Sequence, residues 1–335
     1  MRPFVRAELV NDCCGDPGLY VDFLFHRRAL LFDLGDLHRL PPRKLLRVSH
    51  AFVSHTHMDH FVGFDQLLRV LLAREKRLEL FGPPGFIERV QSKLSAYSWN
   101  LVEHFPAALT ITASEFYPDG RVEKATFDCR ERFHMVPGDR EIVSDGVLVQ
   151  EPAFRVRAAL LEHDIPCLAF ALEEARHVNV LKDRLEARGL RVGPWLTDLK
   201  DAVLRDDPPE TQIRAQCEKG SARQDALLTL GELRADVLRI VPGQKIAYVT
   251  DAANNRKNHD RIVRLAHGAD LLFIEAVFMD EDAGLAREKR HLTAGQAGRI
   301  ARDAAAKELT VFHFSPRYQG REAALRREAE GAFRS

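Results

Sequence analysis

Short apolar runs bounded by turn-forming residues recur along the chain. Their length and their content of β-branched and aromatic residues favour strands over helices. Early runs follow one another closely, whereas later runs alternate with helical patterns, so we expect two sheets faced by helices in a layered α/β architecture. The runs occupy residues 19–25, 29–34, 51–53, 78–81, 109–112, 154–160, 167–172, 246–250, 271–277 and 309–314.

Helical patterns separate some of these runs. Leu67, Leu68, Leu71 and Leu72 share one face of a predicted helix. Thr293 has the side chain and the position of a helix N-cap before the alanine-rich stretch 294–306.

One long segment, residues 173–224, breaks the regular spacing of the runs. It carries mixed charge, Gly-Pro and Pro-Pro pairs and only a patchy helical pattern. A stretch of this length inside a compact domain is usually an insertion. The sequence therefore predicts a single domain over residues 1–335, with 173–224 inserted in it as an arm or a lid.

The composition is that of an ordinary globular protein, with 335 residues, 45% hydrophobic and 29% charged. The formal net charge is zero, so a nucleic-acid substrate would require a local basic patch. Five cysteines, with no Cys-x-x-Cys pair, argue against a disulfide framework and against a structural zinc knuckle. We find no signal-peptide core and no run approaching ~18 apolar residues, and we expect a cytoplasmic protein without a membrane span.

Candidate metal ligands gather directly after the apolar run 51–53. His55, His57, Asp59 and His60 occupy six consecutive positions. Neutral imidazole and carboxylate groups are preferred ligands of Zn²⁺. Three histidines in this arrangement after a buried strand predict a metal site rather than a packing role.

Three later runs also deliver a potential ligand at or just past their C-terminal ends. These ligands are His163, Asp251 and His313. A sheet gathers the ends of distant strands at one edge, and rigid strand ends hold ligand geometry well. We therefore expect these side chains to converge on the first cluster.

Five histidines and two aspartates are too many for one tetrahedral zinc ion. They fit two ions that share a bridging carboxylate, and two metals ~3.5–4 Å apart ionise a water for hydrolysis. Manganese or iron also occupies nitrogen and oxygen sites of this kind. The predicted division gives one ion His55, His57 and His163, gives the other Asp59, His60 and His313, and makes Asp251 the bridge.

The spacing His55-x-His57-x-Asp59-His60 is similar to the signature of the metallo-β-lactamase-fold hydrolases. The later segments 162–166, 246–251, 275–276, 280–283, 291–294 and 312–318 resemble, in their order, the motifs of ribonuclease Z, the endonuclease that trims tRNA 3′ trailers. This resemblance implies a four-layer αβ/βα sandwich of the metallo-β-lactamase type and a homodimer. Segments 193–195 and 199–200 resemble part of the arm with which that family grips tRNA.

The resemblance also implies roles for three residues. Asp59 would act as general base toward the bridging water, and His291 would donate a proton to the leaving 3′ oxygen. Glu275 would hold the His291 imidazole in the working tautomer, as carboxylate partners of histidine commonly do.

The chain departs from the family pattern at several positions. Ile274 and Leu292 replace a usual histidine and a usually small residue, and residues 11–16 replace a glycine-rich signature. With the neutral net charge, the altered N-terminus favours a second hypothesis, a metallo-hydrolase of a small ester such as a cyclic nucleotide, an arylsulfate or a lactone. A third hypothesis is a binding protein that kept the fold without catalysis, against which the intact ligand set argues.

Overall fold

The computed structural model describes residues 5–24, 26–219 and 222–335. Residue 25 of the first predicted strand, residues 220 and 221 of the predicted insertion, and residues 1–4 of the predicted domain lie outside these ranges. The described chain divides into two compact units. The larger comprises Val5–Leu148, Val156–Leu172 and Lys245–Ser335, and the smaller comprises Val149–Arg155 and Glu173–Gln244.

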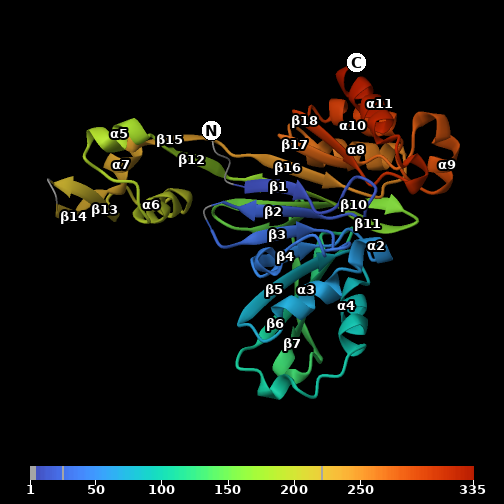
Figure 1. The fold of residues 1–335 in the computed structure, drawn as a ribbon, viewed down its shortest axis with the longest axis horizontal. Coiled ribbons are helices and arrows are strands. Elements are labelled where there is room, and N and C mark those ends of the chain that lie inside the picture. Colours follow the sequence, from blue (N-terminus) through green and yellow to red (C-terminus); the bar gives the residue numbers. More distant parts are fainter. Residues whose placement is uncertain (1–4, 25, 220–221) are drawn as a thin grey trace. The chain divides into compact units, whose positions relative to one another are not determined.

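An eight-stranded sheet forms the N-terminal half of the larger unit, and its strands lie in chain order (Figure 1). β3, β4, β5 and β6 pair in parallel, and the outer pairs are antiparallel. Every residue of β8 is exposed. The strands are β1 (Val5–Leu9), β2 (Leu19–Phe23), β3 (Ala29–Phe32), β4 (Val48–Phe52), β5 (Lys76–Gly82), β6 (Leu109–Phe116), β7 (Arg121–Asp128) and β8 (Met135–Ile142).

A six-stranded sheet, most of whose residues belong to the larger unit, has the order β18-β17-β16-β11-β10-β9. β16, β17 and β18 run parallel to one another, so their C-terminal ends lie at the same edge. The strands are β9 (Val147–Gln150), β10 (Phe154–His163), β11 (Ile165–Glu174), β16 (Lys245–Val249), β17 (Leu271–Glu275) and β18 (Glu308–Phe312).

Aromatic side chains join the inner faces of the two sheets. The Phe32 ring, from the first sheet, lies 5.6 Å from Phe170 and 5.9 Å from Tyr248, both from the second, between ring centroids. Phe52 contacts Phe170 in the same way, at 5.6 Å. This aromatic layer holds the sheets face to face and positions the strand ends that carry the ligands.

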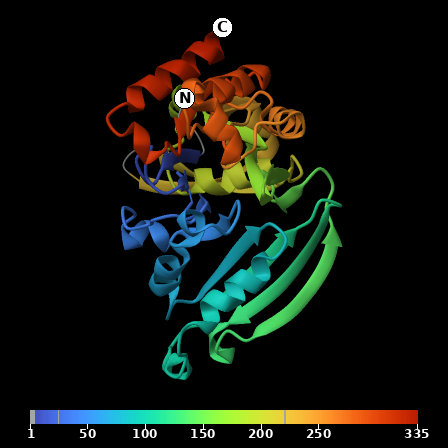
Figure 2. The ribbon, with the colours of Figure 1, turned by 90° about the vertical axis from the view of Figure 1, so that its right-hand side faces the viewer.

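Helices cover the outer faces of both sheets. α3 (Phe64–Leu71) and α4 (Phe86–Ser95) pack on the first sheet, and Figure 2 shows α4 along its long strands. α8 (Arg256–Ala266), α10 (Ala294–Asp303) and α11 (Glu322–Arg334) pack on the second sheet. The result is the predicted four-layer αβ/βα sandwich. Leu67, Leu68 and Leu71 are buried on α3 as predicted, whereas Leu72 follows the last residue of the helix and is half-buried. Thr293 caps α10, as predicted, in a capping box with Gln296.

The smaller unit has its own hydrophobic core. Trp195 is buried there, and its Nε1 donates to the Arg191 carbonyl at 2.8 Å. The unit continues past residue 224, the predicted end of the insertion, because β15 pairs with β12. Its elements are β12 (Arg176–Val180), α5 (Lys182–Ala187), α6 (Trp195–Leu204), β13 (Gln212–Lys219), β14 (Ala222–Thr229), α7 (Leu230–Val237) and β15 (Leu238–Pro242).

None of the helices in the described ranges combines the length and the apolar character that a membrane span requires.

Candidate metal centre

The segment 55–60, which carries the first four candidate ligands, begins in the turn after β4 and continues into α2 (Met58–Phe61). His55 is fully buried just past the end of β4, and His57 is the extended residue that precedes the helix. Asp59 and His60 lie in the single turn of α2, with His60 fully buried. This tight strand–turn–helix path brings four donors to one place.

The three later ligands lie at strand ends, as the sequence predicts. His163 is the last residue of β10, Asp251 lies two residues after β16, and His313 follows β18 directly. Asp251 and His313 have φ angles of 37° and 59°, in the left-handed region that residues other than glycine rarely adopt. Such backbone conformations concentrate at functional sites, where the surroundings hold them in place.

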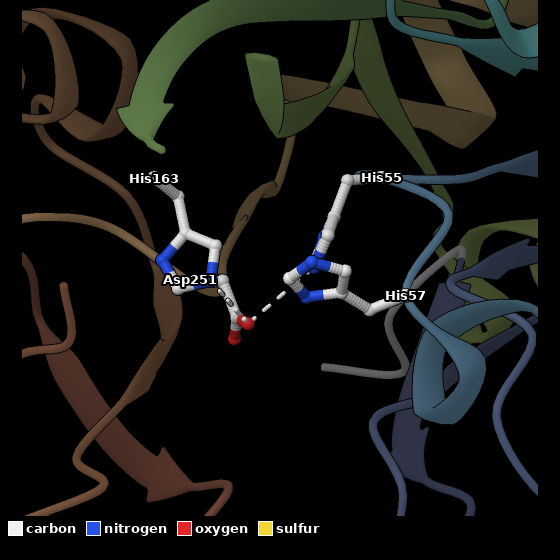
Figure 3. Close-up of side chains that lie close together, drawn as sticks. All are labelled: His55, His57, His163 and Asp251. Carbon is white, nitrogen blue, oxygen red and sulfur yellow. Dashed lines mark ion pairs between the residues drawn. The ribbon is translucent and has the colours of Figure 1, made fainter. Parts of the chain in front are cut away.

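One group of donors contains His55, His57, His163 and Asp251, whose ligand atoms all lie within 4.8 Å of one another (Figure 3). His55 Nε2 lies 3.5 Å and His163 Nε2 lies 3.3 Å from Asp251 Oδ2. His55 and His57 lie between β4 of the first sheet and α2, whereas His163 is the last residue of β10 in the second sheet. The three imidazoles gather around the same carboxylate, that of Asp251.

A second group contains Asp59, His60 and His313. Asp59 Oδ2 lies 3.4 Å from His60 Nε2 and 3.3 Å from His313 Nε2. Asp251 reaches this group as well, with Oδ2 at 3.5 Å from His60 Nε2 and Oδ1 at 2.9 Å from His313 Nδ1. Its carboxylate therefore touches both groups.

The donor set fits a metal. His55 Nε2 and His60 Nε2 are buried and have no hydrogen-bond partner within the described ranges. A buried polar atom without a partner is costly, and these nitrogens face carboxylate oxygens in the mixture that zinc prefers. The geometry and chemistry of these residues therefore fit a metal site.

The protonation states of the free protein suit metal binding. Burial and the neighbouring His60 lower the pKa of His55 to about 2, so its imidazole is neutral and has a lone pair to donate. Burial alone would raise the pKa of Asp251, but the His313 and His60 imidazoles hold it well below its usual value. Asp251 is therefore ionised at neutral pH.

Asp33, which follows Phe32 inside the run 29–34, contacts a candidate ligand and was not among the residues predicted from the sequence. Its buried carboxylate accepts hydrogen bonds from the Ser54 N–H at 2.7 Å and the Tyr248 hydroxyl at 3.0 Å. It also contacts His60 Nδ1 at 2.9 Å. A carboxylate partner of this kind orients a ligand histidine toward the metal. The available signal was an acid directly after an apolar run, the same signal that identified Asp251.

His291 and Glu275 form a further group with Asp251 and His313, and the ligand atoms of this group also lie within 4.8 Å of one another. Glu275 is fully buried at the end of β17, and its Oε2 lies 2.8 Å from His291 Nδ1. The other carboxylate oxygen accepts hydrogen bonds from the Ala252 and Leu292 N–H groups at 2.7 and 3.3 Å. Burial opposes protonation of His291, but Glu275 raises its pKa above the usual value. The structure thus brings together all nine side chains that the sequence analysis selected.

Comparison with known proteins identifies relatives over most of the chain. No family model matches it. The chain is 34% identical over 293 residues to ribonuclease Z of Deinococcus radiodurans, covering 87% of this chain and 83% of that one. It is 32% identical over 286 residues to ribonuclease Z of Thermobifida fusca, covering 85% and 73%.

Solved structures show the same fold. The metallo-β-lactamase-fold protein YhfI from Bacillus subtilis superposes with a TM-score of 0.55 at 16% identity, over 98% of this chain and 92% of that one. The short form of human tRNase Z superposes with a TM-score of 0.53 at 18% identity, over 94% and 93%. The extensive identity to named relatives, with the metal site and the fold, leads to one conclusion: this chain belongs to the ribonuclease Z family and is a metal-dependent hydrolase, an endoribonuclease.

Proposed function

We propose that this protein removes 3′ trailers from tRNA precursors and holds two Zn²⁺ ions for this purpose. The observation that carries the proposal is the position of the His291–Glu275 pair. His291 Nδ1 lies 4.0 Å from Oδ1 of Asp251, and the Asp251 carboxylate touches both donor groups. A proton donor in that position serves a leaving alkoxide oxygen such as the ribose 3′ oxygen. The relatives named ribonuclease Z and tRNase Z support the choice of substrate.

Seven side chains would hold the ions, and Asp251 contacts residues proposed for each ion. When bound, two divalent ions supply an ionised water at neutral pH and neutralise charge on the phosphodiester. The first ion would take His55, His57 and His163, the second Asp59, His60 and His313, and Asp251 would be shared.

Asp59 is the proposed general base. Its side chain is 43% exposed, whereas Asp251 is almost fully buried, so Asp59 is the carboxylate that an attacking water reaches. Burial would raise the pKa of Asp59, but His313 and His60 lower it well below its usual value. The group is therefore ionised and available to accept a hydrogen bond from the water and orient it.

His291 is the proposed general acid. Its Nδ1 faces Glu275, which leaves Nε2 as the ring nitrogen available to a substrate. The imidazole is 16% exposed, so it is reachable from solvent while it is held by a fully buried partner. In this arrangement Glu275 fixes the ring and stabilises its protonated form.

A small-ester hydrolase is the second candidate, because the formal net charge of zero provides no general attraction for RNA. We further propose a cytoplasmic homodimer, with residues 173–224 acting as an inserted arm toward RNA. Five free cysteines are consistent with a reducing compartment. Mass measurement in solution tests the dimer.

The deciding experiment compares cleavage of a 3′-extended tRNA with hydrolysis of bis(p-nitrophenyl) phosphate. His291→Ala is expected to lower the rate on tRNA by about 10²–10⁴ and to affect the p-nitrophenyl ester far less, because p-nitrophenolate leaves without protonation. His267→Ala, at an exposed histidine outside the site, is the matched control. Wild-type activity on the small ester alone would replace the proposal with the second candidate.

A further inference from the structure

Two adjacent cysteines that the proposed function does not use, Cys13 and Cys14, line a cavity of about 1080 Å³ in the larger unit. The rest of its wall comes from the edge strand β18 and from one side of α11; we call this space the α11 cavity. Both cysteines are free and half-buried. A cavity with two neighbouring thiols in its wall is a candidate site for a ligand that bonds to sulfur.

The two cysteines occupy the central positions of a tight turn that its neighbours hold in place. The Gly15 N–H donates to the Asp12 carbonyl at 2.9 Å and closes the turn. The Phe314 N–H donates to the Cys13 carbonyl at 2.7 Å. On the N-terminal side, Asn11 Nδ2 donates to two backbone carbonyls, at 2.9 and 2.8 Å. A ligand that needs both sulfurs therefore does not have to order the backbone first.

The spacing of the two cysteines favours a bridging ligand over a disulfide. A side-chain hydrogen bond joins the thiols of Cys13 and Cys14, so the two sulfurs are close to each other. The peptide bond between the two residues is trans, and Cα atoms across such a bond lie about 3.8 Å apart. Disulfides usually span ~4.4–6.8 Å between Cα atoms, and shorter spans strain the bond and make it easy to reduce. An atom inserted between the sulfurs lengthens the link and removes this obstacle.

The number of donors and their charge select against an ordinary metal ion. No group of three or more potential ligands in the described ranges includes Cys13 or Cys14, whereas a structural zinc ion usually has four ligands. Burial, the adjacent Cys13 and the nearby Glu322 carboxylate raise the pKa of Cys14 to about 11. Cys14 is therefore a neutral thiol at neutral pH, and metals bind the thiolate. The site suits a ligand that needs only two sulfurs and reacts with thiols in their protonated form.

We propose that Cys13 and Cys14 chelate a trivalent organic arsenical, an arsonous acid R–As(OH)₂, and that its organic group lies in the α11 cavity. Two As–O bonds and two S–H bonds break, two As–S bonds form, and the hydroxyls leave with the thiol protons as two waters. Arsenic stays trivalent, so the step needs no oxidant or reductant. Leu309, Val311 and Phe333 line the cavity and provide apolar contacts for an aryl group. This binding does not depend on the proposed function.

The first test measures binding of phenylarsonous acid, which forms from phenylarsine oxide in water. The full chain is titrated with this probe, and native mass spectrometry counts the adducts while a thiol reagent counts the remaining reactive cysteines. We expect one phenylarsenic group per chain and the loss of two reactive thiols. The dithiol 2,3-dimercaptopropanol should remove the adduct, whereas 2-mercaptoethanol at the same concentration of thiol groups should not. Equal removal by the monothiol would overturn the proposal, because it would show attachment through a single sulfur.

Serine variants assign the adduct to the two cysteines. Cys13→Ser and Cys14→Ser are each expected to weaken binding by about 10²–10⁴-fold, because the second arsenic–sulfur bond forms within one molecule only when both thiols are present. Cys217→Ser is the matched control, since this free cysteine is also half-buried but lies in the smaller unit. Binding that either of the first two variants leaves unchanged, or that Cys217→Ser abolishes, would overturn the proposal.

The second test separates the folded site from two cysteines that are merely adjacent. Asn11→Ala keeps both thiols but removes the hydrogen bonds that hold the chain before the turn, so we expect several-fold weaker binding. Asn100→Ala, at an exposed asparagine outside the cavity wall, is the control. Phenylarsonous acid should also bind several-fold more tightly than methylarsonous acid, because only the phenyl group fills the apolar part of the cavity. Equal affinities of the two arsenicals would overturn the placement in the α11 cavity.

Discussion

At the scale of single residues, each buried ligand histidine is fixed by a contact through its second nitrogen. His60 Nδ1 meets Asp33, His163 Nδ1 donates to the Arg290 carbonyl at 2.8 Å, and His55 Nδ1 lies 3.0 Å from Ser54 Oγ. These contacts set the tautomers so that Nε2 faces the shared carboxylate. The site is therefore arranged for metal by the chain itself.

Glu275→Gln tests the role of the carboxylate behind His291. The amide keeps the shape of the side chain but loses the charge that stabilises protonated His291, so we expect a 10- to 100-fold lower kcat on RNA. If His291 protonates the leaving oxygen, the loss must grow with the pKa of the leaving group across a series of aryl phosphodiesters. An equal loss across the series would indicate a structural role only. Glu288→Gln, at an exposed acid on α9 (Ala283–Glu288), is the control.

Cys14 provides a test of pH dependence at one residue. Burial and the adjacent Cys13 raise the pKa of the Cys14 thiol to about 11. Because the thiolate is the nucleophile, alkylation of Cys14 by iodoacetamide should be slow at pH 8 and should rise about tenfold per pH unit up to pH 10. A free thiol, with a pKa of about 8.5, levels off earlier. Peptide-resolved mass spectrometry measures the rate, and a plateau below pH 9 would contradict the assignment.

At the scale of elements, the site depends on where strands end and on how closely α2 approaches β3. Asp33, His163, Asp251 and His313 all lie at or just past strand ends. The junction of α2 and α3 packs against the chain that follows β3, where the Gly63 N–H donates to the Leu34 carbonyl at 2.8 Å. Small shifts of this junction therefore move Asp59 and His60.

Gly63→Ala should destabilise the protein and weaken its metal binding. A Cβ at this position would lie 2.0 Å from the Gly35 carbonyl oxygen and 2.7 Å from Leu37 Cγ, and we expect a loss of about 1–3 kcal/mol in the free energy of unfolding. Urea unfolding and metal analysis measure the two effects. Gly284→Ala is the matched control, because a Cβ there meets nothing within 4 Å and alanine favours the α9 helix by up to ~1 kcal/mol. Equal stability of the two variants would refute the close packing.

At the scale of the whole molecule, the chain has two compact units and one tryptophan in each. Trp99 belongs to the larger unit, which holds all seven proposed metal ligands, and Trp195 belongs to the core of the smaller unit. A ligand stabilises the cooperative unit that binds it, by RT ln(1 + [L]/Kd). The two fluorophores therefore report separately on the consequences of metal binding.

Metal removal should act on the larger unit. Single-tryptophan variants, Trp195→Phe and Trp99→Phe, are melted with zinc and with a chelator. At a zinc concentration of 100 Kd, binding contributes about 2.7 kcal/mol, so we expect the Tm reported by Trp99 to fall by several degrees on chelation. The Tm reported by Trp195 should change little. Equal shifts of both transitions would show that the two units unfold as one.

The residues by themselves predicted the ten apolar strands, the layered α/β architecture and the seven candidate metal ligands. These features are local, because an apolar run specifies a strand and the residue after it specifies what the strand end presents. The resemblance to the family motifs added His291 and Glu275 and their roles, because a histidine before a helix cap has no local pattern that indicates a catalytic role. The roles themselves are predictions that the experiments above address.

Only the tertiary structure decided the rest. β8 has no buried residue and therefore no apolar run to reveal it, and β15 was placed by its pairing with β12. The contact of Asp33 with His60 and the hydrogen bond from Phe314 to the Cys13 carbonyl join residues that no local pattern relates. Such contacts depend on how sheets and helices pack, because packing fixes the distances between side chains that are far apart in the sequence.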